Sequence, residues 1–375
     1  MKIGIDANPI LGDRGGVGWH TYHLLKALLE LKEQDDQVEF VAYVRPGSLR
    51  AYAADLEPFR EAGVAGRLRW VEAGKLGMRW RGWVDGLDLY HGTNFKIRTS
   101  GRSGGIVTVH DLWLDRYPQY STKLLGQRAS FYRTKRTAWR ARRVITVSDY
   151  SARDIESLYG LPRSRITVIP NAVSDDFRPV QDPDAPAQIR RRFGLSADRF
   201  ILFVGGADPR KNHRTLLRAY AQRADQLRDC CLLLVGDVRH RFGDMMATAR
   251  GLGLEAHVTC PGRLSLADLR QLYSQAAVFV FPSIYEGFGM PVLEAMACGA
   301  PVITSSTTSL PEVAGDAALL VDPENVEALG DALQRLLEDA ALRERLRTKG
   351  VERVKGFTWD RSARRTMNLY RELCR

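Results

Sequence analysis

The sequence predicts an α/β protein built from two doubly wound, Rossmann-like parallel-sheet domains. Short apolar runs rich in β-branched residues alternate with longer segments of helical periodicity, which is typical of a parallel sheet covered by helices. This alternation is interrupted by a proline-rich segment and then starts again. A chain of 375 residues is also too long for one ordinary core. These three observations favour two domains facing a cleft, with the carboxyl ends of the strands toward it.

The first series of strands and helices predicts a domain over residues 1–178. We expect its strands at Ile3–Ala7, Val38–Val44, Asp88–His91, Ile106–Val109, Val144–Val147 and Thr167–Ile169. We expect its helices near Trp19–Leu31, Lys123–Trp139 and Ser151–Tyr159. The segment from Asp176 to Pro186, rich in proline and aspartate, reads as a linker.

The second series predicts a domain over residues 179–356. We expect its strands at Phe200–Val204, Cys231–Val235, His257–Cys260, Val278–Phe281, Pro301–Thr304 and Ala318–Val321. We expect its helices at His213–Ala224, Leu266–Ser274, Pro291–Ala297, Val326–Glu338 and Leu342–Lys349. The last segment, residues 357–375, has a helical pattern of its own.

Composition excludes several classes of protein. Hydrophobic residues make up 45% and charged residues 26%, which is ordinary for a globular chain and unlike a disordered or fibrous one. No apolar run approaches the roughly 18 residues of a membrane span, and the start turns polar too soon for a signal peptide. The five cysteines form no CxxC pair and suggest reduced thiols in a cytoplasmic protein. The net charge of +11 predicts an anionic partner: a phosphate-bearing substrate, a membrane surface or nucleic acid.

A glycine-rich turn follows the first expected strand. Gly15, Gly16 and Gly18 open the next helix, where free backbone N–H groups attract anions. The dinucleotide pattern GxGxxG is broken by Thr21, and no P-loop lysine follows. The turn therefore indicates either a ligand contact or close packing.

Two glutamates eight positions apart give the strongest chemical signal. Glu286 lies in a loop after an expected strand, and Glu294 lies about one turn inside the helix that Pro291 begins. Gly287 and Gly289 expose backbone N–H groups between them. Amides suit a phosphate and carboxylates suit vicinal hydroxyls, so the segment predicts a site for a polyol phosphate.

The run Glu286-Gly-Phe-Gly-Met-Pro-Val-Leu-Glu294, continuing to Ile303, closely resembles glycosyltransferase family 4. These are retaining enzymes of GT-B architecture. Further matching segments cover nearly the whole chain: residues 109–111, 147–148, 169–173, 203–206, 209–212, 309–316 and 321–323. The resemblance implies that the last helix crosses back onto the first domain.

The resemblance also implies residue roles. Glu294 would bind the nucleotide ribose, Glu286 the donor sugar, and Arg210 and Lys211 the donor diphosphate. A charge-assisted bond to phosphate stabilises the leaving group as its charge develops. The remaining donor-site candidates are Gly15, Gly16, Gly205, Arg263, Gly287, Phe288, Gly289, Met290, Pro291 and Val292.

The acceptor is expected on the first domain. His110 follows a strand end and is the candidate catalytic group that positions the sugar, with Asp111 orienting it. His91 and Asn94 are further acceptor candidates. The family does not usually need a metal, and no cysteine–histidine spacing suggests a metal site, so no cofactor is expected.

A basic stretch runs from Lys123 to Arg143 without an acidic residue, and aromatic residues interleave with it. Trp80 and Trp83 lie among arginines in an earlier segment. Such segments suit an anionic membrane surface or a lipid diphosphate. A solvated basic face over buried aromatic residues is the alternative.

The sequence therefore predicts a retaining hexosyltransferase. The segments around residues 204–213 and 309–323 look most like members that use GDP-mannose or GDP-rhamnose, so GDP-mannose is the favoured donor and a glycan or lipid-diphosphate-linked oligosaccharide the favoured acceptor. A UDP-sugar donor remains open. The rival classes are a sugar-nucleotide epimerase or related oxidoreductase, and a nucleic-acid-binding protein. The broken GxGxxG and the lack of any nucleic-acid-binding motif argue against them.

Overall fold

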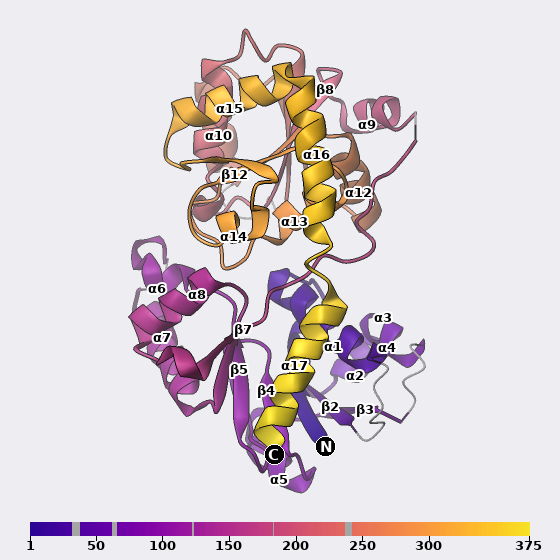
Figure 1. Ribbon diagram of the computed structural model, residues 1–375, viewed down its shortest axis with the longest axis vertical. Helices are drawn as coiled ribbons and strands as arrows, with labels where there is room; N and C mark the ends of the chain where they lie inside the picture. The colour runs from indigo at the N-terminus through magenta and orange to yellow at the C-terminus, as the bar shows by residue number, and fades with distance from the viewer. Residues whose placement is uncertain (32–37, 62–65, 122–123, 183, 237–241) are drawn as a thin grey trace. The chain divides into compact units, whose positions relative to one another are not determined.

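A computed structural model describes residues 1–31, 38–61, 66–121, 124–182, 184–236 and 242–375. The chain forms two compact units (Figure 1). The first unit comprises Met1–Asn171 and Thr358–Arg375, and the second comprises Ala172–Phe357. Each has one parallel sheet, so the predicted pair of doubly wound α/β units is confirmed.

The first unit contains a seven-stranded sheet of order β3-β2-β1-β4-β5-β6-β7. Its strands are β1 (Lys2–Asp6), β2 (Glu39–Val44), β3 (Leu68–Glu72), β4 (Leu89–Gly92), β5 (Gly105–Val109), β6 (Arg143–Thr146) and β7 (Ile166–Val168). Its helices are η1 (Asn8–Ile10), α1 (Gly16–Glu30), α2 (Ser48–Ala51), α3 (Ala53–Leu56), α4 (Pro58–Glu61), α5 (Lys75–Val84), α6 (Trp113–Arg116), η2 (Pro118–Tyr120), α7 (Leu124–Arg140), α8 (Asp149–Asp154), η3 (Ile155–Tyr159), η4 (Arg163–Arg165) and α17 (Trp359–Cys374).

The second unit contains a six-stranded sheet of order β10-β9-β8-β11-β12-β13. Its strands are β8 (Arg199–Val204), β9 (Cys230–Val235), β10 (Val258–Gly262), β11 (Val278–Phe281), β12 (Val302–Ser305) and β13 (Ala318–Val321). Its helices are α9 (Ala185–Phe193), η5 (Pro209–Lys211), α10 (His213–Gln222), α11 (Phe242–Gly251), α12 (Leu266–Gln275), α13 (Met290–Ala297), α14 (Leu310–Ala314), α15 (Val326–Glu338) and α16 (Ala340–Val354).

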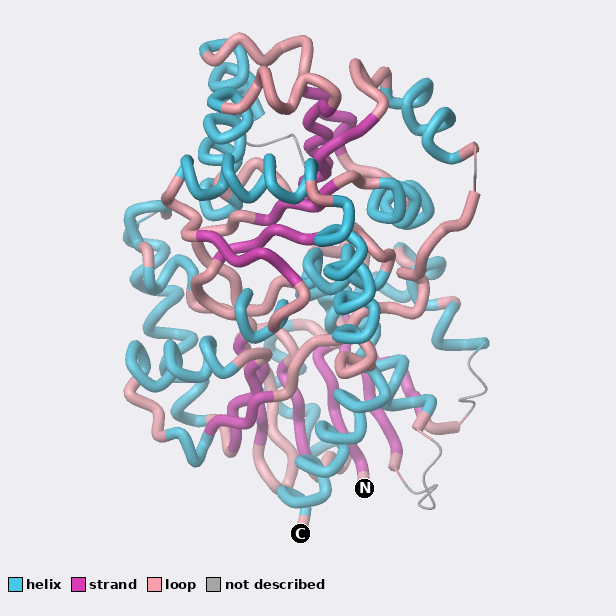
Figure 2. The backbone as a smooth tube through the Cα atoms, turned by 45° about the horizontal axis from the view of Figure 1, so that its top comes forward, coloured by secondary structure: helices cyan, strands magenta, loops and turns pink. Residues whose placement is uncertain are grey.

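The central strands are mostly apolar and buried, because helices cover both faces of each sheet (Figure 2). Every residue of β9 and β11 is buried. The strand order reverses between β1 and β4 in the first sheet and between β8 and β11 in the second. Loops at the carboxyl ends of such neighbouring strands diverge to opposite faces, and ligands of doubly wound sheets bind there.

The last helix, α17, belongs to the first unit, as expected from the sequence. It packs against α1 and against β4. Tyr370 Oη lies 2.7 Å from His91 Nδ1, and both side chains are fully buried. Ser362 Oγ donates to the carbonyl of Pro170. The C-terminal helix is therefore one of the helices that pack on the first sheet.

The structure moves the expected boundary between units from 178 to the peptide between Asn171 and Ala172. Asn171 bonds to His20 in the first unit, whereas Val173 N donates to Phe357 O in the second. These contacts lie far apart in the sequence, which is why composition alone placed the change later, at the proline-rich segment.

Several elements differ from the expectation, and α2, α3, α4, α6, α11 and α14 are among the helices that were not predicted. β3 and α5 were also not predicted, because the apolar residues of β3 are interrupted by Arg69 and Glu72, and α5 is too short and too basic to show a buried apolar stripe. α9 begins at Ala185, inside the expected linker, with Pro186 in its first turn. The expected helix start at Lys123 lies outside the described residues. No helix in the described part of the chain is long and apolar enough to cross a membrane.

We expect Tyr370→Phe to destabilise the first unit. It leaves the buried His91 Nδ1 without a partner, which costs about 1–3 kcal/mol. Tyr132→Phe removes the same hydroxyl from an exposed side chain and is the matched control. Urea unfolding measured by circular dichroism compares the two variants. Equal midpoints would show that the His91–Tyr370 contact does not stabilise the unit.

Candidate active site

The candidate site in the second unit begins with two strands that are neighbours in the sheet but distant in the sequence. β8 and β11 pair in parallel, so the segments that follow them meet at one edge. η5 follows β8 and carries Arg210 and Lys211. The amide of Ile284, after β11, donates to the carbonyl of Arg210 at 2.8 Å. The two predicted parts of the donor site, the basic pair and the Glu286 loop, are thus brought together.

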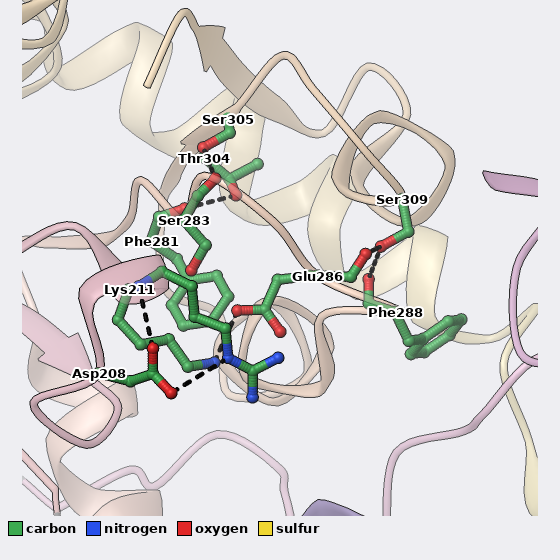
Figure 3. Close-up of polar contacts among 10 residues, drawn as sticks. Asp208, Lys211, Phe281, Ser283, Glu286, Phe288, Thr304, Ser305 and Ser309 are labelled. Carbon is green, nitrogen blue, oxygen red and sulfur yellow. Dashed lines mark hydrogen bonds and ion pairs between the residues drawn. The ribbon is translucent and has the colours of Figure 1, made fainter. Parts of the chain in front are cut away.

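Lys211 and Glu286 form a buried ion pair (Figure 3). Lys211 Nζ lies 2.6 Å from Glu286 Oε1. The side chains are only 12% and 8% exposed. The ammonium also lies 4.7 Å from the centroid of the Phe281 ring, which adds a cation–π contact. The Lys211 ammonium is therefore held by Glu286 in the loop after β11 and by Phe281 at the end of that strand.

Burial and neighbouring charges determine the pKa values of Glu286 and Lys211. Burial favours the protonated form of Glu286, but Lys211 and Arg210 outweigh burial and lower the pKa of this carboxyl. Burial lowers the pKa of the Lys211 ammonium, and Glu286 offsets part of that effect. The carboxyl is thus held as a carboxylate, and its counter-ion is a cation taken out of bulk water.

Ser309 shapes the loop that carries Glu286. Its Oγ lies 2.9 Å from the carbonyl of Glu286 and 2.8 Å from that of Phe288, and Figure 3 shows it pointing at this turn. Gly289 has φ 110°, and a Cβ there would lie 2.6 Å from Leu310 Cδ2. A side chain at Gly289 would therefore be strained and would collide with its neighbour. Ser309 begins a segment that resembles the family, but it was not predicted as a site residue.

Glu294 lies on α13, the helix that this loop opens. Its Oε2 accepts a hydrogen bond from Tyr273 of α12 at 2.9 Å. Burial raises the pKa of Glu294 to about 7, although the bond from Tyr273 acts in the opposite direction. A carboxyl of this kind gains its charge most readily when hydroxyl groups of a ligand replace the missing water.

Asn212 was not singled out as a site residue, but it fixes the turn that holds the basic pair. It has a left-handed backbone with φ 61°, which asparagine tolerates. Its Nδ2 donates to the carbonyls of Pro282 at 3.0 Å and Pro323 at 2.6 Å. The turn after β8 is thereby tied to two neighbouring loops.

The other donor-site candidates of the second unit divide by exposure. Gly205 follows β8 and Arg263 is exposed after β10. Phe288 is 6% exposed, and Met290 and Pro291 are partly buried in the first turn of α13. Val292 is fully buried, so its side chain serves packing. Gly287 lies in the loop beside Glu286.

In the first unit the glycine turn separates into two functions. A Cβ on Gly18 would lie 2.6 Å from the carbonyl of Pro9, so close packing requires this glycine. A Cβ on Gly15 or Gly16 would meet nothing within 4 Å. Those two glycines leave the start of α1 open, as a ligand-facing backbone would require.

His110 lies directly after β5 and is 7% exposed. Its Nε2 donates to the carbonyl of Thr93 at 2.8 Å, which leaves Nδ1 as the acceptor. Burial lowers the pKa of this imidazole. Asp111 Oδ1 accepts from Trp113 N at 3.3 Å, and its expected role in orienting His110 stays a prediction. His110 is thus a neutral, oriented imidazole at a strand end.

His20, to which the sequence gave no role, packs against His110. The ring centroids lie 4.6 Å apart at 80°. His20 Nδ1 donates to Asn171 Oδ1 at 2.7 Å, and the buried Nε2 has no hydrogen-bond partner. The sequence signal that could have indicated His20 is its position two residues after Gly18, in the helix that the glycine turn opens.

His91 is bonded at both ring nitrogens, to Tyr370 and to Thr108 Oγ1 at 2.8 Å. Neither ring nitrogen of His91 is available to bind an acceptor substrate, so His91 joins strands and helix inside the first unit. Asn94 is partly buried beside Phe95, whose φ of 56° is strained for an aromatic residue. Among the described residues, no three His, Cys, Asp or Glu side chains lie close enough to hold a metal ion.

We expect Glu286→Gln to destabilise the second unit by about 3–5 kcal/mol, because it leaves the Lys211 ammonium buried without a counter-charge. Combining it with Lys211→Met removes that charge and should restore much of the loss. Chemical unfolding of both variants tests this. A double variant as unstable as Glu286→Gln would contradict an unpaired charge as the cause.

Glu294 should make stability depend on pH. Its pKa is about 7 in the folded chain and about 4.5 in an unfolded chain, so the folded state loses stability as pH rises between these values. Glu294→Gln should match the parent near pH 5 and exceed it by on the order of 3 kcal/mol above pH 7. Thermal unfolding across this range tests it. A constant difference between the two proteins would contradict the raised pKa.

Two family models match the chain. Residues 14–177 match the model described as Glycosyltransferase Family 4, and residues 187–353 match the one described as Glycosyl transferases group 1. Together they cover the sequence-predicted signals of both units.

Individual relatives agree with these matches. The chain is 34% identical over 289 residues to the O-antigen chain mannosyltransferase B of Escherichia coli, covering 76% of this chain and 74% of the relative. It is 30% identical to the serotype-specific mannosyltransferase WbdA of Escherichia coli, covering 62% of this chain but only 29% of that protein. A sucrose-phosphate synthase structure from Thermosynechococcus elongatus superimposes with a TM-score of 0.75 at 24% identity, covering 99% of this chain and 98% of that one. The chain therefore belongs to glycosyltransferase family 4 and is a glycosyltransferase with the GT-B fold.

Proposed function

We propose that this enzyme is a retaining mannosyltransferase that moves mannose from GDP-mannose to a hydroxyl of a glycan or lipid-linked oligosaccharide. The observation that carries the proposal is the meeting of Arg210, Lys211, Glu286 and Glu294 at one sheet edge. The similarity to two proteins named mannosyltransferases supports the choice of sugar.

In the proposed donor site, Glu294 accepts hydrogen bonds from the two ribose hydroxyls. Two hydroxyl donors stabilise the carboxylate, so nucleotide binding lowers the raised pKa of Glu294. Tyr273 holds the carboxyl in place from the other side. The N–H groups at the start of α13 face the sugar or the adjacent phosphate.

Arg210 and Lys211 are proposed to bind the donor diphosphate. In the structure the Lys211 ammonium is held by Glu286. A bound diphosphate provides stronger oxygen acceptors for the ammonium, and Glu286 is then available to the hydroxyls of the donor sugar. The two roles implied for Glu286 and Lys211 are thus linked by one ion pair.

The proposed reaction breaks the bond between the anomeric carbon and the phosphate oxygen. The electron pair stays on that oxygen, where Arg210 and Lys211 stabilise the added charge. The acceptor hydroxyl oxygen forms the new bond on the same face of the sugar, and its proton passes to the leaving phosphate oxygen. In this step the leaving phosphate oxygen takes the acceptor's proton, so no side chain is assigned as the base.

The acceptor side is proposed on the first unit, where His110 and Asp111 follow β5 and Asn94 follows β4. His110 Nδ1 suits a hydroxyl donor, so His110 positions the transferred sugar. Gly15 and Gly16 provide open backbone for the donor's sugar or phosphate.

The donor is tested by thermal unfolding with GDP, UDP, ADP and TDP, followed by transfer assays with the matching sugars. A ligand at 100 times its Kd adds about 2.7 kcal/mol of stability. We expect a shift with GDP that Glu294→Gln reduces, whereas Glu327→Gln on the exposed start of α15 leaves it unchanged. NMR of the product should show the donor's anomeric configuration retained. A shift with UDP alone would show that the donor is a UDP-sugar and not GDP-mannose. An inverted product would overturn the retaining mechanism.

A further inference from the structure

Helix α5 is anchored in the first unit by a small inner face. Met78 is buried with Tyr43, Val71, Leu87 and others. Gly82 N donates to Thr99 Oγ1 at 2.9 Å, and a Cβ on Gly82 would lie 1.7 Å from the carbonyl of Ser100. The helix is thus pressed against the segment around Ser100 and cannot roll to bury its other side.

The opposite side of α5 is an apolar stripe that faces water. Trp80 is 71% exposed, Trp83 85%, Leu76 79% and Val84 59%. Their spacing of three and four residues places them on one side of a helix. A stripe of this size exposed on a helix indicates a surface that another phase or molecule covers.

Cations surround this stripe. Lys75 and Arg79 are exposed and lie next to it on the helix. The nearby acid, Asp85, is buried and already contacts Arg69 at 2.9 Å, Arg81 at 3.8 Å and the Tyr43 hydroxyl at 2.6 Å. The acid therefore does not neutralise Lys75 or Arg79.

Helix α7 presents more positive charge on the same face of the sheet. Ile97 packs against both the cluster that contains Met78 of α5 and the cluster that contains Ala138 of α7, which places both helices on one face. Leu124–Arg140 contains no acidic residue. The exposed arginines of α7 are Arg128, Arg133, Arg136 and Arg140.

We propose that the stripe on α5 docks the first unit on an anionic lipid bilayer, with Trp80, Trp83 and Leu76 entering the headgroup region. Indole rings prefer that region, and a short helix with an apolar side and cationic flanks lies along it. The arginines of α7 add attraction to acidic headgroups. The charge complementarity selects lipid over a second copy of the chain, because two such basic faces would repel each other. The proposal does not depend on which sugar is transferred.

The test is flotation of the full chain with phosphatidylcholine vesicles, with and without phosphatidylglycerol. We expect the enzyme to float with the anionic vesicles and to lose binding as salt is raised. Trp80→Ser with Trp83→Ser should weaken partitioning at least tenfold, because two large apolar groups no longer leave water. Lys75→Gln with Arg79→Gln should weaken it about fivefold for each charge removed.

Leu320→Ser is the matched control, since Leu320 is 40% exposed in the second unit, and it should float like the parent. The thermal shift with nucleoside diphosphate must be kept in every variant, which separates this proposal from the donor assignment. A parent enzyme that does not float, or a tryptophan variant that floats equally well, would overturn the docking proposal. So would a dimer in light scattering that the tryptophan changes dissociate, because a second copy would then cover the stripe.

Discussion

The pairing of β8 with β11 is the constraint on which the proposed donor site depends. These strands are neighbours in the sheet, although β9 and β10 and the helices η5, α10, α11 and α12 lie between them in the sequence. Because both strands run in the same direction, the turn with Lys211 and the loop with Glu286 end at one edge. Their charges then meet at 2.6 Å in a buried place. Asn212 and Ser309 hold the two loops by bonding to backbone carbonyls.

A buried ion pair is a costly way to hold two loops, because both ions lose water. In the proposed function the cost has a purpose, because a charged ligand replaces each member of the pair as the partner of the other. The diphosphate of a donor would satisfy the cation, and sugar hydroxyls would satisfy the carboxylate. The raised pKa of Glu294 has a similar explanation, since hydrogen-bond donors of a bound ligand would stabilise its carboxylate. The proposed donor site thus carries charges before the ligand binds, and these charges are only partly compensated by neighbouring groups.

The first unit uses the same topology with different chemistry. Its strands β4 and β5 end near buried histidines whose pKa values are lowered by burial, and β1 ends at Asp6, which pairs with Arg98. Tyr370 of α17 contacts one of these histidines, His91. The chain end therefore contributes to the support of β4 and, through His91 and Thr108, of β5. In contrast, α5 on the other face leaves its large apolar side chains in water. On one face of the sheet α1 and α17 pack against each other, and on the other face α5 presents the exposed apolar stripe that we propose binds lipid.

The sequence alone determined the α/β alternation, most strand positions, the carboxylate pair of the Glu286–Glu294 segment and the basic pair before it. Those signals are local, since periodicity and loop chemistry are complete within a few residues. Only the tertiary structure decided that Tyr273 orients Glu294, that Ser309 shapes the loop, that His91 is consumed by packing and that α5 turns its tryptophans outward. Each of these depends on a partner from another element of the chain, 21 residues away for Tyr273 and 279 for His91, and a local pattern contains no information about which distant group will pack there.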